Sequence, residues 1–132
     1  MKLVLPRNWR KLWFFRIERK SNLKKIAKDG LHPDYLINPN PMVGGHFGNM
    51  NTGLAFIRTY GNKVLFFTPY PNQAWNYASS THANELIRFG LPKSLDPHSI
   101  YEDSTGYFGV VKIPPEDIEV KIKNRWRPIT EL

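Results

Sequence analysis

Hydrophobic positions along this chain fall into short runs separated by turn residues, a pattern that favours several short strands over long helices. The clearest strand is predicted at residues 118–122, where Ile118, Val120 and Ile122 alternate with charged residues, as in a strand with one buried face. Residues 12–17 (LWFFRI) form a dense aromatic run that ends in a β-branched residue, which also favours a strand. Strands are therefore expected near both ends of the chain.

Three further strands are predicted in the middle of the sequence. Residues 54–60 and 64–68 flank the turn pair Gly61-Asn62, so we expect these two segments to pair as a hairpin. Residues 106–113 form another apolar run, and Pro-Pro-Glu-Asp at residues 114–117 predicts a turn after it.

A short helix is predicted in the segment SNLKKIAKDGL, residues 21–31. Ser21 is a candidate N-cap, Leu23 and Ile26 recur at helical spacing, and Gly30 stands where a glycine commonly ends a helix. The lysines between the apolar positions would then face the solvent.

Two more short helices are predicted, one starting at Pro71 and ending near residue 79, and one within residues 81–90. Residues 32–53, rich in Asn, Gly and Pro, and residues 91–105 are predicted to be loops. The expected fold class is α+β, with mixed strands and two to three short helices in a single small domain that covers residues 1–132.

The amino-acid composition limits which kinds of functional site the chain can contain. With 41% hydrophobic and 23% charged residues, the chain has the composition of a packed globular protein. The absence of cysteine excludes a disulfide framework, a thiolate metal site and a cysteine nucleophile. The four histidines are scattered without metal-ligand spacing, so no metal site is predicted. No apolar run approaches the roughly 20 residues that span a bilayer, and we expect a cytoplasmic protein without a membrane partner.

The formal net charge of +8 is concentrated at the start of the chain. Residues 1–28 contain ten Lys and Arg against the single acid Glu18, a net charge of +9, and the remaining nine cations meet ten acids. Such a cluster is either a solvated face or an electrostatic surface for phosphates, most often those of nucleic acid. The candidate residues for binding single-stranded DNA or RNA are Arg7, Arg10, Lys11, Arg19, Lys20 and Lys24.

Several short motifs resemble the ADP-ribosyltransferase-like superfamily, and within it the DNA-modifying ADP-ribosyltransferase toxins. A strand that carries a His or Arg, here Arg16, leads into a helix of the form NLxxIxxxGL, which residues 22–31 match. An Asn-Pro-Asn loop follows at residues 38–40, then Arg58 ahead of VLFFTPYP, and finally IPPEDI near the end. Together these motifs span most of the chain.

The resemblance implies an NAD-dependent transferase that acts on nucleic acid, with NAD as its substrate. The segment VLFFTPYPNQAWNYAS would form one side of the NAD pocket, with aromatic residues stacking on nicotinamide. Cleavage of the nicotinamide–ribose bond develops an oxocarbenium ion, so the site needs an aromatic wall, cations for the pyrophosphate and a carboxylate. By this resemblance Arg58 is the catalytic cation, and the residues expected to bind NAD are Arg16, Asn22, Thr68, Tyr70 and Tyr77.

The sequence departs from the family at the catalytic carboxylate. The family glutamate aligns with Thr105 or Gly106, and the nearest acids are Glu102 and Asp103, which we expect to serve as the catalytic group if their loop folds back toward the site. Whether the chain is an enzyme therefore stays open at this point.

Two other functions remain alternatives. One is a catalytically inactive nucleic-acid-binding module on the same fold, in which aromatics stack on bases and lysines follow the backbone. The other is a small accessory protein that binds a protein partner through WRKLWFF at residues 9–15, in which case Trp9 and Trp13 would be solvent-exposed.

Overall fold

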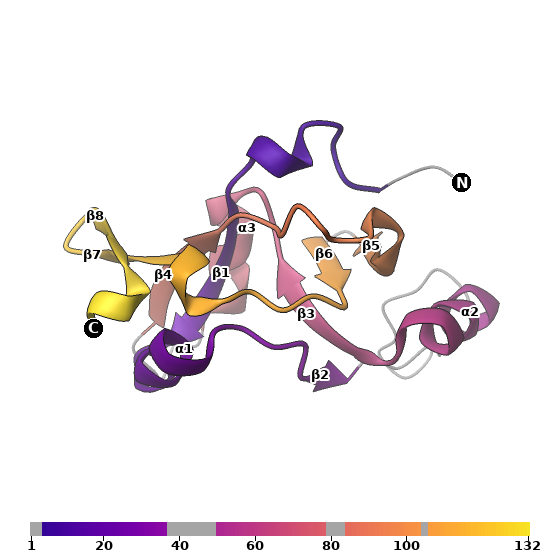
Figure 1. Cartoon of the computed structure of the whole chain (residues 1–132), viewed down its shortest axis with the longest axis horizontal. Helices are drawn as coiled ribbons and strands as arrows, with labels where there is room; N and C mark the ends of the chain where they lie inside the picture. The colour runs from indigo at the N-terminus through magenta and orange to yellow at the C-terminus, as the bar shows by residue number, and fades with distance from the viewer. Residues whose placement is uncertain (1–3, 37–49, 79–83, 104–105) are drawn as a thin grey trace.

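The computed structural model describes residues 4–36, 50–78, 84–103 and 106–132, and within these residues the chain forms two antiparallel sheets of four strands each (Figure 1). The first sheet has the order β1-β4-β7-β8, and the second has the order β2-β3-β6-β5. The strands of the first sheet are β1 Phe14–Arg19, β4 Asn84–Phe89, β7 Ile118–Ile122 and β8 Arg125–Pro128. Those of the second are β2 Tyr35–Leu36, β3 Lys63–Phe67, β5 Ile100–Asp103 and β6 Gly106–Gly109.

The two sheets meet where β1 passes the end of β3. Phe15 and Thr68 exchange two backbone hydrogen bonds there, of 2.7 and 3.1 Å. The core includes the residues next to this junction. The fully buried ring of Phe14 packs edge-on against Phe67, with 5.3 Å between the ring centroids. The α+β fold class of a single small domain is confirmed.

Three short α-helices, some of them extended by 3₁₀ turns, surround the sheets in the described part of the chain (Figure 1). They are α1 Leu23–Asp29, α2 Met50–Tyr60 and α3 Pro71–Ala74. The 3₁₀ turns are Trp9–Lys11, Lys20–Asn22, Trp75–Tyr77, Pro97–Ser99, Pro115–Asp117 and Ile129–Glu131. None of the described helices is long and apolar enough to cross a membrane.

The helix predicted within residues 21–31 is confirmed, but its predicted cap is wrong. A 3₁₀ turn precedes α1, so the N-cap position falls on Asn22 rather than Ser21, and no described side chain caps the helix through a hydrogen bond. The predicted C-terminal glycine is confirmed. Gly30 adopts a positive φ of 76°, and a Cβ there would lie 2.2 Å from the carbonyl oxygen of Ile113. Only glycine fits this close approach.

The strand predicted at residues 54–60 is wrong, because these residues belong to α2. The partly buried Phe56 and Ile57 pack against a small cluster that contains Val64 and Phe108. Because the segment is rich in β-branched and aromatic residues, local propensity favours a strand, and this tertiary contact overrides it. The predicted hairpin with residues 64–68 is therefore also wrong, and β3 pairs with β2 and β6 instead.

The helix predicted within residues 81–90 is also wrong, since β4 lies there as an inner strand between β1 and β7. Leu86, Ile87 and Phe89 are all buried. An inner strand covered on both faces loses the alternation that marks a half-buried strand, and its apolar residues then mimic helical spacing. The predicted loops at 32–53 and 91–105 likewise contain the short strands β2 and β5.

Candidate functional site

A cavity of about 340 Å³ lies beside the junction of the two sheets and is lined largely by aromatic rings. The ring of Phe66 on β3 is central to it, with centroids 4.2 Å from Tyr77 and 5.2 Å from Phe108. Residues from both sheets and from the turn after α3 line the cavity, among them Arg16, Tyr35, Val64, Phe66, Tyr77 and Phe108. The arrangement suits a flat ring, which gains from stacking against aromatic faces.

A second, polar cavity of about 470 Å³ adjoins the first, because Arg16 and Asp34 line both. It lies between β1 and α1, and its lining carries both signs of charge. The polar residues that line it are Arg16, Glu18, Asn22, Lys25, His32 and Asp34. We refer to the two neighbouring cavities together as the β1 cleft, with an aromatic part and a charged part.

Arg16 is fixed in the β1 cleft by three hydrogen bonds. Its Nη1 donates to the carbonyl oxygen of Phe66 at 2.9 Å, and its Nε and Nη2 donate to Oε1 of Glu18 at 3.0 and 2.6 Å. Asn22 Nδ2 donates to the other oxygen of Glu18, Oε2, at 3.3 Å. Side chains two residues apart on a strand share a face, which explains why Arg16 and Glu18 meet.

The residues predicted to bind NAD divide into two groups. Arg16, Asn22 and Tyr77 line the β1 cleft: Arg16 lines both parts, Asn22 only the polar part and Tyr77 only the aromatic part. Thr68 does not line it, because its side chain is fully buried and its hydroxyl bonds to Gln73 Oε1. Tyr70 does not line it either. It is 66% exposed at the start of α3, where its backbone N–H donates to Thr68 Oγ1 at 3.2 Å.

Arg58 was predicted on a strand as the catalytic cation, and that strand does not exist. Arg58 lies exposed in the last turn of α2, and it is not among the described residues that line the two cavities of the β1 cleft. Its role in catalysis stays a prediction. The Asn-Pro-Asn motif at residues 38–40 lies outside the described residues.

Glu102 lies on β5 on the face of the second sheet that points away from the aromatic rings of the cleft. It pairs across the sheet with Tyr107, whereas Tyr101 pairs with Phe108, and neighbouring positions on a strand face opposite sides. Burial, and secondly the nearby Glu102 carboxylate, raise the pKa of Tyr107 to about 12. The side chain of Asp103 lies outside the described part of the chain.

Gly106, one of the two positions that align with the family glutamate, cannot carry a side chain without displacing its surroundings. Its φ is +146°, and a Cβ built there would lie 2.7 Å from Cε2 of Phe66. Thr105, the other aligned position, lies outside the described residues. The Phe66 ring therefore occupies the space that the Cβ of a side chain at residue 106 would need.

Several features of the cleft were missing from the sequence prediction, and two of them are Glu18 and Phe108. Glu18 was counted only as the single acid of a basic segment, although strand alternation from Arg16 would have placed it on the same face. Phe108 contributes a ring from β6, and no local signal links it to Phe66, because the strand pairing that joins them is a tertiary feature.

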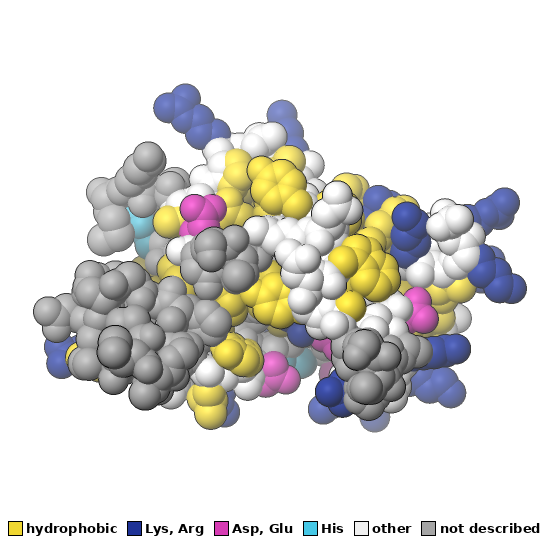
Figure 2. Space-filling model, turned by 180° about the vertical axis from the view of Figure 1, so that it is seen from behind, with side chains coloured by type: hydrophobic (Ala, Val, Ile, Leu, Met, Phe, Trp, Pro, Cys, Tyr) yellow, Lys and Arg dark blue, Asp and Glu magenta, His cyan; other side chains and the backbone are white. Residues whose placement is uncertain are grey.

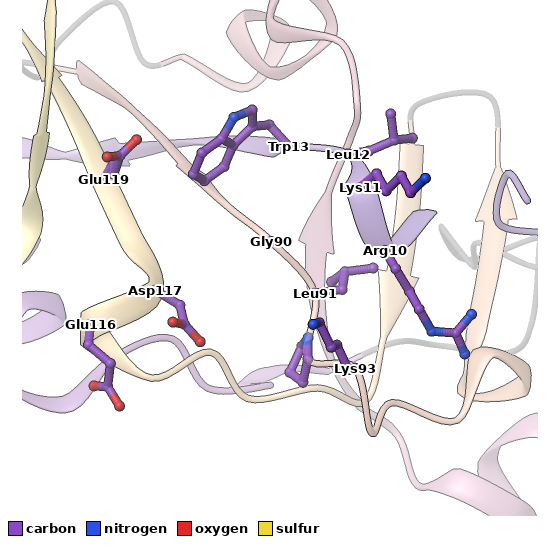
Figure 3. A pocket seen from close by; sticks show the side chains of 11 residues that line it. Arg10, Lys11, Leu12, Trp13, Gly90, Leu91, Lys93, Glu116, Asp117 and Glu119 are labelled. Carbon is purple, nitrogen blue, oxygen red and sulfur yellow. The ribbon is translucent and has the colours of Figure 1, made fainter. Parts of the chain in front are cut away.

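A separate cavity of about 550 Å³ lies on the other end of β1, around the exposed Trp13 (Figure 3). Figure 3 shows its cations on one side and its carboxylates on the other. The charged residues are Arg10, Lys11 and Lys93 facing Glu116, Asp117 and Glu119. The carboxylates offset the cations, so this cavity does not concentrate positive charge.

Of the two N-terminal tryptophans, one is buried and the other is exposed. Trp9 is 2% exposed and belongs to the core, whereas Trp13 is 44% exposed. The guanidinium of Arg88 lies between Trp13 and Trp126, 4.2 Å from each ring centroid. Residues 9–15 are therefore not one exposed aromatic patch, as the partner-binding alternative requires.

The six basic residues predicted to bind nucleic acid are exposed, but they form two groups. Arg7, Arg10 and Lys11 precede β1, and Arg19, Lys20 and Lys24 follow from its last residue. A strand of this length separates its ends by about 20 Å. Figure 2 shows the opposite face from Figure 1, with hydrophobic side chains across its middle and Lys and Arg spread around its margins. The basic segment is thus a divided surface rather than one patch.

Comparisons with protein-family models, with curated proteins and with solved structures find no match for this chain.

Proposed function

We propose that this chain is an NAD-dependent ADP-ribosyltransferase-like protein that acts on nucleic acid, with NAD bound in the β1 cleft. The observation that carries the proposal is the convergence of Arg16, Asn22 and Tyr77 on one cleft. These residues come from three segments, and the sequence resemblance independently assigns all three to NAD.

The two parts of the cleft match the two kinds of chemistry in a dinucleotide. The aromatic part, lined by the rings of Tyr35, Phe66, Tyr77 and Phe108, offers ring faces against which the nicotinamide can stack. The polar part carries Lys25 and Arg16, whose N–H groups can donate to a pyrophosphate, although Glu18 already pairs with one edge of the Arg16 guanidinium. Arg16 and Asp34 line both parts, so in this proposal one extended ligand contacts both.

The acceptor in this proposal is single-stranded DNA or RNA. The two basic groups that flank β1 supply phosphate contacts on either side of the strand that carries Arg16. An acceptor that contacts both groups would pass along β1, and the cleft opens beside this strand.

The first experiment is calorimetric titration with NAD, combined with mass spectrometry of nicotinamide release in the presence of mixed single-stranded DNA and RNA. Tyr77→Ala should abolish NAD binding, because it removes a stacking wall. Tyr70→Ala is the matched control, since this exposed tyrosine lies on the neighbouring segment outside the cleft. Arg58→Ala tests the predicted catalytic cation, and it should abolish the mass increment on nucleic acid while NAD still binds. Absence of NAD binding by the wild-type chain would refute the proposal.

A second candidate function is favoured by Gly106. Residue 106 is a glycine, and Phe66 fills the space that a side chain there would need, so this position does not supply the family's catalytic carboxylate. A nucleic-acid-binding module without catalysis would bind single strands in a salt-sensitive manner and would release no nicotinamide. The same experiment separates the two candidates.

A further inference from the structure

The Glu18 carboxylate is an unusual feature for a cleft that is proposed to bind a pyrophosphate. Its side chain is 11% exposed, and it lines the polar part of the β1 cleft but not the aromatic part. A carboxylate there repels phosphate groups, and through its 2.6 Å ion pair it offsets the charge of Arg16. The section of the cleft next to Glu18 therefore favours a hydrogen-bond donor over an anion.

Glu18 also has acceptor capacity that its described partners do not fill. An ionised carboxylate offers about four acceptor sites. Oε1 accepts two bonds from Arg16, whereas Oε2 accepts a single bond of 3.3 Å from Asn22. The three bonds hold the carboxylate in place, so its remaining sites are preorganised for a donor from a ligand.

The hydroxyls of a ribose are the donors of a dinucleotide that fit such a group. A carboxylate that bonds to a ribose 2′-hydroxyl is a recognised way of binding NAD, and the same carboxylate rejects a ribose with a 2′-phosphate. Glu18 lines the polar part of the cleft and not the aromatic part, so of the two riboses of NAD we place the adenosine ribose next to it.

We propose that Glu18 binds the 2′-hydroxyl of the adenosine ribose of NAD, and that it thereby selects NAD against its 2′-phosphorylated form, NADP. The inference rests on the proposed function and adds a specificity-determining residue to it. Arg16 and Asn22 act as positioning residues, since they fix the carboxylate.

Asp34 is the competing carboxylate, because it lines both parts of the cleft. It is exposed, and Arg16 does not hold it. A variant of Asp34 must therefore be tested beside the variant of Glu18.

The test is calorimetric binding of NAD and NADP to four full-length chains, namely the wild type, Glu18→Gln, Asp34→Asn and Glu119→Gln. Glu119 is the matched control, since it forms a 2.6 Å ion pair with Arg88 on the same sheet but outside the β1 cleft. The wild type should bind NAD at least about tenfold more tightly than NADP, because like charges in the site are costly. Glu18→Gln should remove most of this preference, and the other two variants should retain it.

A binding measurement on the wild type alone keeps the inference testable if Glu18→Gln fails to fold. An NAD analogue that lacks the 2′-hydroxyl of the adenosine ribose should bind about tenfold more weakly than NAD, as expected for a lost hydrogen bond to a charged group. Equal binding of NAD and this analogue overturns the inference, as does an unchanged preference in Glu18→Gln or a preference lost only in Asp34→Asn. These outcomes leave the proposed function standing, whereas failure of the wild type to bind NAD at all removes both.

Discussion

Arg16 donates a hydrogen bond of 2.9 Å to the carbonyl oxygen of Phe66, and this bond joins β1 of the first sheet to β3 of the second. The same guanidinium holds Glu18, so one side chain links the two sheets and also shapes the polar part of the β1 cleft. The position of the cleft therefore depends on one of the contacts that hold the sheets together.

Replacement of Arg16 should lower stability as well as ligand binding. Arg16→Ala leaves the mostly buried Glu18 carboxylate without its ion pair, and the expected loss is about 2 kcal/mol in the free energy of unfolding. Arg16→Lys keeps the charge but not the pair of hydrogen bonds from Nε and Nη2 to Glu18, so its loss of unfolding free energy should be intermediate. Urea denaturation measures both variants. Arg19→Ala is the control at an exposed position, with a change within about 0.5 kcal/mol. Equal losses in Arg16→Ala and Arg19→Ala would refute the structural role of Arg16.

A second stability prediction concerns Gly106. A side chain there would be disfavoured both by the positive φ and by contact with Phe66, and the two effects can be measured separately. Gly61 also has a positive φ, of +97°, but a Cβ there meets nothing within 4 Å. Gly61→Ala should therefore cost only backbone strain, about 1 kcal/mol, and Gly106→Ala should cost about 1–2 kcal/mol more. The two free energies of unfolding, compared with that of the wild type, give the difference.

A double-mutant cycle assigns that extra cost to a particular contact. Phe66→Leu removes the ring atoms nearest to the added Cβ, so it should be less damaging in the Gly106→Ala background than in the wild type. Additive effects of the two substitutions would show that Phe66 does not determine why residue 106 is glycine.

Helices and strands were predicted correctly where residues close together in the sequence determine them. The helix that contains Leu23 and Ile26 was predicted because its apolar spacing and its glycine lie within ten residues. The alternating strand at residues 118–122 was predicted for the same reason, since one face is buried and the other is not. The strand β4 was missed because it is covered on both faces, which removes the alternation.

The candidate site was only partly predictable, because its geometry is non-local. Strand periodicity places Arg16 and Glu18 on one face, but the partner of Arg16 on the second sheet is Phe66, fifty residues away. The family resemblance indicated Tyr77 as a stacking residue, and it gave equal weight to Tyr70, which the fold leaves outside the cleft. The pairing of β3 with β6 brings Phe66 and Phe108 together, and the turn after α3 places Tyr77 against Phe66.

The stability of the protein should fall at high pH because of Tyr107. Its pKa is raised from the ordinary value of 10.0 to about 12, chiefly by burial. A raised pKa in the folded state means that the unfolded chain releases this proton first. The contribution of Tyr107 is therefore complete below pH 10 and is lost as the pH rises toward 12. Unfolding free energies measured across this window should decline less steeply in Tyr107→Phe than in the wild type.

Glu102 is the second cause of the raised pKa of Tyr107, and it offers a control for that assignment. Glu102→Gln removes the negative charge, so the pKa of Tyr107 should fall but stay above 10.0 because burial is the larger cause. Spectrophotometric titration of the tyrosines, with Tyr107→Phe used to identify the late-titrating group, measures the change. An unaltered titration in Glu102→Gln would contradict the proximity of the two side chains.

The divided basic surface predicts that single-stranded nucleic acid contacts both ends of β1. The double variants Arg10→Ala/Lys11→Ala and Lys20→Ala/Lys24→Ala should each weaken binding, and each should reduce the slope of log affinity against log salt by about 1–2. The double variant Lys63→Ala/Lys112→Ala is the control, since it removes the same charge from exposed positions outside the first 28 residues. If only one group changed the slope, the strand would contact one end of β1. If both groups behaved like the control, the N-terminal charge would be a solvated face, as the alternative interpretation of the sequence holds.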